Sequence, residues 1–241
     1  MAIGIISGTG LYDIIKKPEI IDIKTKYGKS SGIFQGKIQG KEIFFIPRHG
    51  MDHGIPPHLI NHRANIYSLK KLGVNLVISV GSVGIINTKI RIEDFVVPHD
   101  FIDFSKNQVT FFEGCKVKHV DMNEPFSIKV RESIIKACRK LKFRVHERGI
   151  YVNTTGPRLE TPAEIRMFRK LCADVVGMTC VPEAVLSKEI DLEYGLLTVP
   201  VNYAAGISKE EINLEKARNR MKEKQEDVRK ILESSIKLLK E

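Results

Sequence analysis

Short apolar runs alternate with amphipathic segments along almost the whole chain. Continuous apolar runs of the kind that form buried parallel strands occur at Ala2–Ile6, Val74–Val80 and Leu196–Val201. Shorter strands are expected at 32–39, 41–47, 95–101, 143–152 and 174–177, the first two forming a hairpin around Gly40. Helical spacing of apolar residues is found at 61–72, at 127–141, after Thr161, from Pro182 and from Ser208 onwards. This alternation predicts an α/β protein with a central mixed β-sheet flanked by helices, folded as one domain over residues 1–241.

Two of the helices carry start signals. Thr161-Pro162-Ala163-Glu164 combines an N-cap threonine, a proline in the first turn and the glutamate of a capping box. Ser208 and Glu211 repeat the capping-box spacing. We therefore predict that a long last helix begins at Ser208.

Small and polar residues follow four of the apolar strands. The segments are Ser7-Gly8-Thr9-Gly10, Pro47-Arg48-His49-Gly50, Gly81-Ser82-Val83-Gly84 and Asn202-Tyr203-Ala204-Ala205-Gly206. Because ligands of open α/β sheets bind outside the carboxyl ends of the strands, we expect these segments to form one site. The first is neither a Walker loop nor a Rossmann fingerprint, since it lacks the following Gly-Lys-Ser/Thr and the third glycine. Taken alone, Asn202 could equally well cap a helix or close a turn.

The charge of the chain changes this picture little. The 241 residues carry a formal net charge of +10, which permits an anionic partner. However, the basic residues are dispersed among glutamates and apolar positions, so a solvated surface is favoured over nucleic-acid binding, which stays open as an alternative. The chain contains no apolar run long enough to span a bilayer. Its first residues are typical of a strand and lack the basic region of a signal peptide, so we expect a cytoplasmic protein without a membrane partner.

Metal and disulfide chemistry are weakly indicated. The stretch 49–62 contains four histidines but only one carboxylate and two adjacent prolines, so no metal is expected there. The four cysteines form no C-x-x-C pair, and most are expected to be buried, although a disulfide among them stays open. They are Cys115, Cys138, Cys172 and Cys180.

Together, the motifs resemble the trimeric purine nucleoside phosphorylase and methylthioadenosine phosphorylase family over nearly the whole chain. The carriers are the segments after the strands, with 61–66, Gly156-Pro157-Arg158 and Met178-Thr179-Cys180-Val181-Pro182-Glu183. The resemblance implies the nucleoside phosphorylase fold and cleavage of a purine nucleoside by inorganic phosphate, giving the base and ribose 1-phosphate. It implies no cofactor, since phosphate is a co-substrate, and a homotrimer or a dimer of trimers.

The resemblance also assigns roles to residues of this chain. Phosphate would be bound by Thr9, Arg48, His49, Ser82 and Thr179. Met178 would lie under the ribose, and His119 would reach the site of the neighbouring subunit. The purine would be held by Leu159, Glu160, Asn202 and Ala204.

Arg48 and Asn202 are the expected catalytic residues. Phosphate is already an anion, so the protein needs to hold it near the anomeric carbon, and a guanidinium fork matches its oxygens. Glycosidic cleavage passes through an oxocarbenium-like state while negative charge develops on the leaving purine. Asn202 can donate a hydrogen bond to that charge, which is strongest in the transition state.

Two positions indicate which purine is taken. Members of the family that take 6-aminopurines have Asp at the positions of Asn202 and Ala204, whereas this chain has neither carboxylate. Asn202, with Glu160 reading the N1–H, suits a 6-oxopurine, because a carboxylate would face the C6 carbonyl as acceptor against acceptor.

The segment 208–218 indicates which 5′ group is taken. It carries Ile212, Leu214 and Ala217 and no histidine, which favours an apolar 5′-methylthio group. S-methyl-5′-thioinosine is therefore the expected substrate, with inosine and guanosine also accepted. The alternatives are a methylthioadenosine phosphorylase, a general inosine/guanosine phosphorylase and a nucleosidase that uses water.

Overall fold

The computed structural model describes residues 2–8, 11, 13–106, 108–114 and 117–239, whose strands join in one eleven-stranded sheet. The strands are β1 (Ala2–Ser7), β2 (Glu19–Ile21), β3 (Ile33–Ile38), β4 (Lys41–Pro47), β5 (Val74–Ile85), β6 (Phe95–Val96), β7 (Asp100–Phe104), β8 (Val145–His146), β9 (Ile150–Thr154), β10 (Val175–Gly177) and β11 (Glu193–Tyr203). The helices are α1 (His62–Lys71), α2 (Ile128–Lys140), α3 (Pro162–Lys170), α4 (Cys180–Glu189), α5 (Leu214–Glu223) and α6 (Gln225–Leu238), with a short 3₁₀ helix at Pro57–Leu59.

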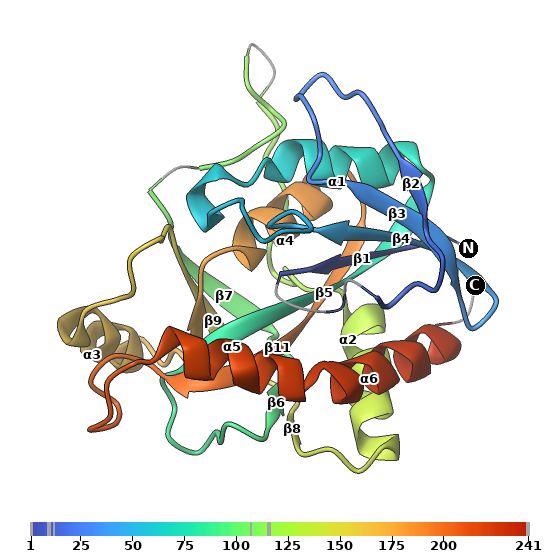
Figure 1. Ribbon diagram of the computed structural model, residues 1–241. Helices are drawn as coiled ribbons and strands as arrows, with labels where there is room; N and C mark the ends of the chain where they lie inside the picture. Colours follow the sequence, from blue (N-terminus) through green and yellow to red (C-terminus); the bar gives the residue numbers. More distant parts are fainter. Residues whose placement is uncertain (1, 9–10, 12, 107, 115–116, 240–241) are drawn as a thin grey trace.

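The sheet is mixed and is covered by helices. Its main path runs β2-β3-β4-β1-β5-β10-β9-β7, and β11 joins β5 to the β6–β8 pair. In Figure 1, α1 and α4 lie on one side of the central strands and α2, α5 and α6 on the other, while α3 lies at the end of the sheet near β9. Two large apolar clusters fill the two layers between sheet and helices. The predicted α/β class is confirmed.

Close packing of α2 on β11 depends on Gly195. A Cβ atom at this position would lie 2.5 Å from Cγ1 of Val130, which is the first fully buried residue of α2. The absent side chain lets the helix approach the strand that carries Asn202 at its far end. The close contact between α2 and β11 at Gly195 therefore helps to hold β11, which carries part of the site, in position.

Several expected boundaries are confirmed. The hairpin around Gly40 is formed by β3 and β4, and the capping box at Thr161 is present, because its side chain accepts from Glu164 N while the Glu164 carboxylate accepts from Thr161 N. Among the described cysteines, Cys138 and Cys180 are buried, Cys172 is exposed, and all three are free; Cys115 lies outside the described residues.

The predicted start of the last helix is wrong. The helix begins at Leu214, because Asn213 provides the N-cap by accepting from Lys216 N at 2.8 Å, while the Ser208 hydroxyl bonds to the Glu210 carbonyl. The helix is also divided into α5 and α6 at Lys224. As a result, residues 208–213 are an irregular segment that leads into α5.

Two expected strands are each divided. Residues 95–101 form β6 and the start of β7, separated by a stretch with Pro98, which has no N–H to give to a neighbouring strand. Residues 143–152 likewise form β8 and β9, separated around Gly149. In the part of the chain that the structure describes, no helix has the length and apolarity needed to cross a membrane.

Strand β5 also differs from the prediction, and this difference creates the site. The sequence predicts that it ends at Val80, before the segment 81–84, but it continues to Ile85 because β11 pairs alongside it up to Tyr203. On its other edge, β1 pairs with β5 as far as Val80, and β10 pairs with Gly84 and Ile85. Along this edge, residues 81–83 therefore lie after the end of β1 and before the start of β10. Ligands of open α/β sheets bind at such points, where the neighbouring strand changes.

Candidate active site

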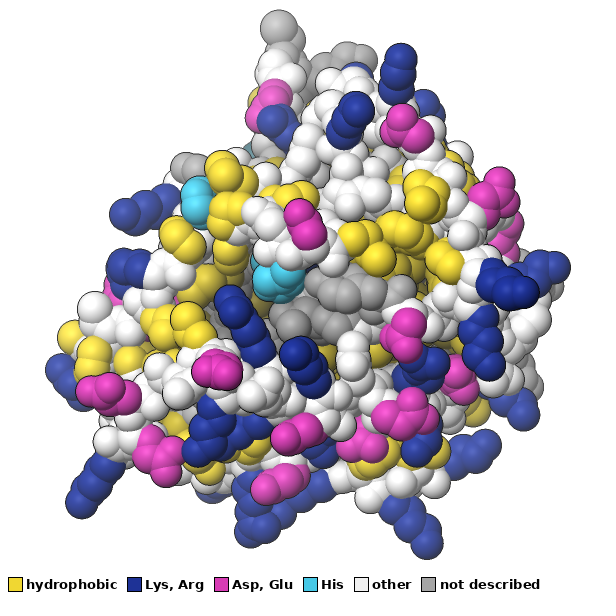
Figure 2. Space-filling view, viewed as in Figure 1, with side chains coloured by type: hydrophobic (Ala, Val, Ile, Leu, Met, Phe, Trp, Pro, Cys, Tyr) yellow, Lys and Arg dark blue, Asp and Glu magenta, His cyan; other side chains and the backbone are white. Residues whose placement is uncertain are grey.

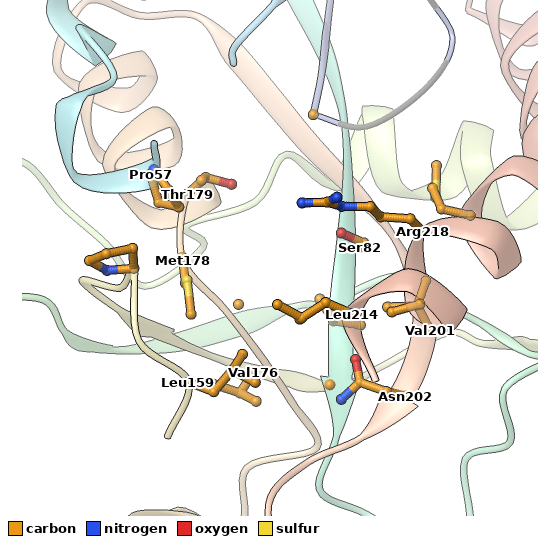
Figure 3. A pocket seen from close by; sticks show the side chains of 18 of the residues that line it. Pro57, Ser82, Leu159, Val176, Met178, Thr179, Val201, Asn202, Leu214 and Arg218 are labelled. Atoms are coloured by element: carbon orange, nitrogen blue, oxygen red, sulfur yellow. The ribbon is translucent and has the colours of Figure 1, made fainter. Parts of the chain in front are cut away.

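A cavity of about 380 Å³ lies at this change of neighbour on β5. Figure 3 shows side chains converging on it from β5, β11, α5 and the segments around Leu159 and Met178. Nine of the predicted site residues line it: Arg48, His49, Ser82, Leu159, Glu160, Met178, Thr179, Asn202 and Ala204. Thr9 lies outside the described residues. His119 is exposed in the segment 117–125 and is not among the described residues that line the cavity.

Arg48 lies at the floor of the cavity and is held by a buried carboxylate. Its Nε donates to Glu183 Oε1 at 2.6 Å and its Nη2 to Glu183 Oε2 at 3.1 Å, in a bidentate pair that is 1% exposed on both sides. Nη2 also donates to Ser79 Oγ at 2.6 Å, and Nη1 donates to the Val80 carbonyl at 2.8 Å. Among the described residues, the second Nη1 hydrogen meets no acceptor, so it is available to a ligand.

Glu183 accepts hydrogen bonds from two further side chains. Ser79 Oγ lies 3.0 Å and Tyr194 Oη 2.8 Å from its Oε2. Burial alone would raise the pKa of the Glu183 carboxyl, but the charge and hydrogen bonds of Arg48 outweigh burial and lower it. Burial alone would likewise lower the pKa of Arg48, and the attraction of Glu183 raises it overall. Both groups are therefore charged, and the pair as a whole is neutral.

His49 is neutral in this site. Its Nδ1 lies 2.7 Å from the Ile55 carbonyl and so carries the hydrogen, which leaves Nε2 as an acceptor. Burial lowers the pKa of His49 to about 4, and the positive charge of Arg48 acts in the same direction. The ring packs against that of His53 in a tilted arrangement, with 4.5 Å between centroids and 43° between the ring planes. His49 therefore offers the site a lone pair and not a positive charge.

Hydroxyl groups and a helix end face the same region. Ser82 projects from β5, and Thr179 is the N-cap of α4 but makes no side-chain capping bond. Its hydroxyl lies 3.6 Å from Cys180 Sγ. The first N–H groups of α4 and the positive end of its dipole add to an environment that suits an anion.

The other end of the cavity has the character of a base pocket. Asn202 follows a bulge in β11 and donates one amide hydrogen to the Tyr203 carbonyl at 2.8 Å. Its second N–H and its Oδ1 have no partner among the described residues. Glu160 is 9% exposed and accepts from Thr154 Oγ1 at 2.6 Å through Oε1, so Oε2 remains to accept from a ligand.

Met178 lies between these two ends of the cavity. Its Sδ would be 2.5 Å from a Cβ at Gly156, whose φ is +64°, so only glycine permits this approach.

The wall formed by α5 is mixed in character. Ile212, Leu214, Ala217 and Met221 supply the apolar surface expected for a methylthio group. Arg218 lies among them, and the prediction of a purely apolar wall missed it. It could have been found as the residue four positions after Leu214, on the same helix face.

Two further residues were not given a role from the sequence. Glu183 ends one of the motifs that carry the resemblance, but its role could have been inferred only as the carboxylate that a buried Arg48 requires. His53 lines the cavity and was considered only as a metal ligand.

The Arg48–Glu183 pair predicts strong coupling in stability. Arg48→Met and Glu183→Leu should each lower the free energy of unfolding by about 3–5 kcal/mol, because each leaves one buried charge without its partner. The double variant should lose clearly less than the sum, since it removes both charges. Denaturant unfolding of the three variants measures this, and losses that add within about 0.5 kcal/mol would contradict the coupling.

The buried His62 predicts acid sensitivity. Burial lowers its pKa to about 4, against the ordinary 6.5. Its Nδ1 lies 3.9 Å from Glu183 Oε1 but has no hydrogen-bond partner in the part of the chain that the structure describes. The unfolded chain therefore binds a proton at a higher pH than the folded chain, and stability falls as the pH drops from 6.5 towards 4. Between pH 7 and pH 5, wild type should lose about 2 kcal/mol more than His62→Gln in urea unfolding. Equal losses in the two proteins would show that His62 does not cause the sensitivity.

Known proteins share this architecture. Residues 2–237 match the Phosphorylase superfamily. A probable S-methyl-5′-thioinosine phosphorylase of Methanothermobacter thermautotrophicus is 42% identical over 99% of this chain and 84% of its own length. An S-methyl-5′-thioadenosine phosphorylase of Pyrococcus horikoshii is 41% identical over 97% of this chain and 91% of its own.

A solved structure is similar as well. The methylthioadenosine phosphorylase from Schistosoma mansoni in complex with adenine has a TM-score of 0.94 at 29% identity, covering 99% of this chain and 91% of that one. The Methanothermobacter and Pyrococcus relatives are named after different nucleosides, a thioinosine and a thioadenosine, but their sequence identities to this chain are almost equal. Sequence identity alone therefore does not decide which base the chain takes. The resemblance inferred from the motifs is confirmed, and the chain belongs to the phosphorylase superfamily.

Proposed function

We propose that the protein cleaves a 6-oxopurine nucleoside with inorganic phosphate, with S-methyl-5′-thioinosine as its preferred substrate. The products would be hypoxanthine and 5-methylthioribose 1-phosphate. The observation that carries the proposal is the cavity itself, in which an anion-binding end at Arg48 and Thr179 faces a base pocket at Glu160 and Asn202. The reaction needs no cofactor or metal, since phosphate supplies the nucleophile.

The anion-binding end supports phosphate as co-substrate. Arg48 is pre-oriented by Glu183, so its free Nη1 hydrogen is fixed without further loss of side-chain entropy. Ser82 and Thr179 provide hydroxyl donors, and the neutral His49 can accept the hydrogen of a monohydrogen phosphate through Nε2. A site of this composition binds a ready-made nucleophile and does not need a general base to activate it.

The base pocket supports a 6-oxopurine. Glu160 Oε2 can accept the N1–H, which is present in hypoxanthine and guanine and absent in neutral adenine. Because one Asn202 hydrogen is committed to the Tyr203 carbonyl, the other can donate to the purine, where negative charge develops as the bond breaks. Ala204 is buried beside Gly84 and adds no carboxylate to the pocket.

We further propose a homotrimer, or a dimer of trimers, in the cytoplasm. His119 is exposed and is not among the described residues that line the cavity of its own chain, which is compatible with a role at the site of a neighbouring subunit. Nucleic acid is not proposed as a partner, because Figure 2 shows Lys and Arg side chains interspersed with Asp and Glu on the face that carries α5 and α6.

A substrate panel tests the proposed function. With phosphate present, kcat/KM should be highest for methylthioinosine, lower for inosine and guanosine by about 10–200-fold, as expected of one apolar contact, and lowest for methylthioadenosine. Release of the base should stop in phosphate-free buffer. If methylthioadenosine is the best substrate, the assignment of the base is wrong, and turnover without phosphate would favour a nucleosidase.

Asn202 is expected to set the choice of base. In Asn202→Asp/Ala204→Asp, a carboxylate faces the C6 carbonyl, so the ratio of kcat/KM for methylthioinosine to that for methylthioadenosine should fall about 100-fold or more. The ratio is the readout because it cancels any general loss of folded enzyme. Asn219→Asp, an exposed position on α5, is the matched control and should leave the ratio unchanged. An unchanged ratio in the double variant would exclude Asn202 as the selector.

A further inference from the structure

Arg218 occupies a position that the assignments above leave without a role. It lies on α5, four residues after Leu214, and lines the cavity. In Figure 3, its side chain extends from the helix towards the side of the cavity where Thr179 is labelled, and Ser82 and Thr179 line the same cavity. These are two of the groups at the anion-binding end, on elements far from α5 in the sequence.

The charge of Arg218 is not compensated. Among the residues that the structure describes, it has no ion pair and no hydrogen bond. The neighbouring arginines of the same region are engaged, because Arg220 Nη1 donates to the Val201 carbonyl at 2.8 Å and Arg229 pairs with Asp13 at 2.6 Å. An exposed arginine that points into a cavity without a partner has all five donors available.

The other ionisable groups lining the cavity cannot supply this charge. Arg48 is neutralised by Glu183, and His49 is neutral. Burial lowers the pKa of His53, and the charge of Arg218 lowers it further, so this ring also tends to be neutral. Glu160 lies at the base pocket, hydrogen-bonded to Thr154, and is the one carboxylate among the described lining residues. A phosphate dianion in this cavity would therefore meet one uncompensated cation, which is Arg218.

We propose that Arg218 is a phosphate-binding residue, which holds the co-substrate from the α5 side of the cavity that Arg48 also lines. A guanidinium can bind two phosphate oxygens in a bidentate manner, whereas Arg48 has one free hydrogen. Arg48 thus fixes the position of the anion, and Arg218 supplies the net attraction. This inference rests on the proposed function for the identity of the anion.

The test measures phosphate binding directly. Isothermal titration calorimetry with inorganic phosphate alone, without nucleoside, should give a Kd for Arg218→Ala about 10- to 100-fold higher than for wild type. Arg218→Lys should recover part of the affinity, because it restores the charge without the fork. Lys222→Ala removes an exposed cation from the same helix outside the cavity, and it should stay within about twofold of wild type.

Steady-state kinetics provides the second readout. Arg218→Ala should raise KM for phosphate by a similar factor and leave KM for the nucleoside within about twofold at saturating phosphate. The inference is overturned if phosphate affinity changes no more than in Lys222→Ala, if the nucleoside KM rises instead, or if phosphate does not bind wild type. Failure of the proposed function is distinct: wild type would then bind phosphate through Arg218 but release no base from any purine nucleoside.

Discussion

The buried pair of Arg48 and Glu183 is the interaction on which the site depends. Arg48 follows β4, Ser79 and Val80 belong to β5, Glu183 to α4 and Tyr194 to β11, and all of them meet in one hydrogen-bonded cluster. An unpaired charge at this depth would be very costly, so each of these elements must be in place before the cluster is satisfied. The floor of the cavity is thereby tied by hydrogen bonds to the strands and the helix that surround it.

This arrangement also means that Arg48 can orient a ligand without adding net charge to the site. The most deeply buried guanidinium contributes direction and hydrogen bonding, while its net charge is cancelled at the same point. Two histidines beside it are kept from protonation by burial. The Arg48 end of the cavity consequently offers hydrogen-bonding groups without net charge, and among the described lining residues the uncompensated cation is Arg218 on α5.

Much of the fold and the site could be predicted from the sequence because the signals were local. Apolar runs and their polar ends identified β1, β4 and β11, and the resemblance placed nine residues that do line one cavity. What failed depended on tertiary contacts. The extension of β5 through Ser82 requires β11 alongside, the start of α5 at Leu214 was decided by Asn213 over Ser208, and the partner of Arg48 could be identified only in three dimensions.

The cavity can be understood as a gap in the sheet left by two short strands. On one edge of β5, β1 stops at the level of Val80 and β10 begins at Gly84, so the peptide groups of residues 81–83 have no strand beside them among the described residues. A chain with a few more strand residues at either end would complete the sheet and fill the space that the ligand needs. The need to bind a ligand therefore limits the lengths of β1 and β10. Longer strands here would add hydrogen bonds to the sheet and stabilise the fold, but they would remove the binding site.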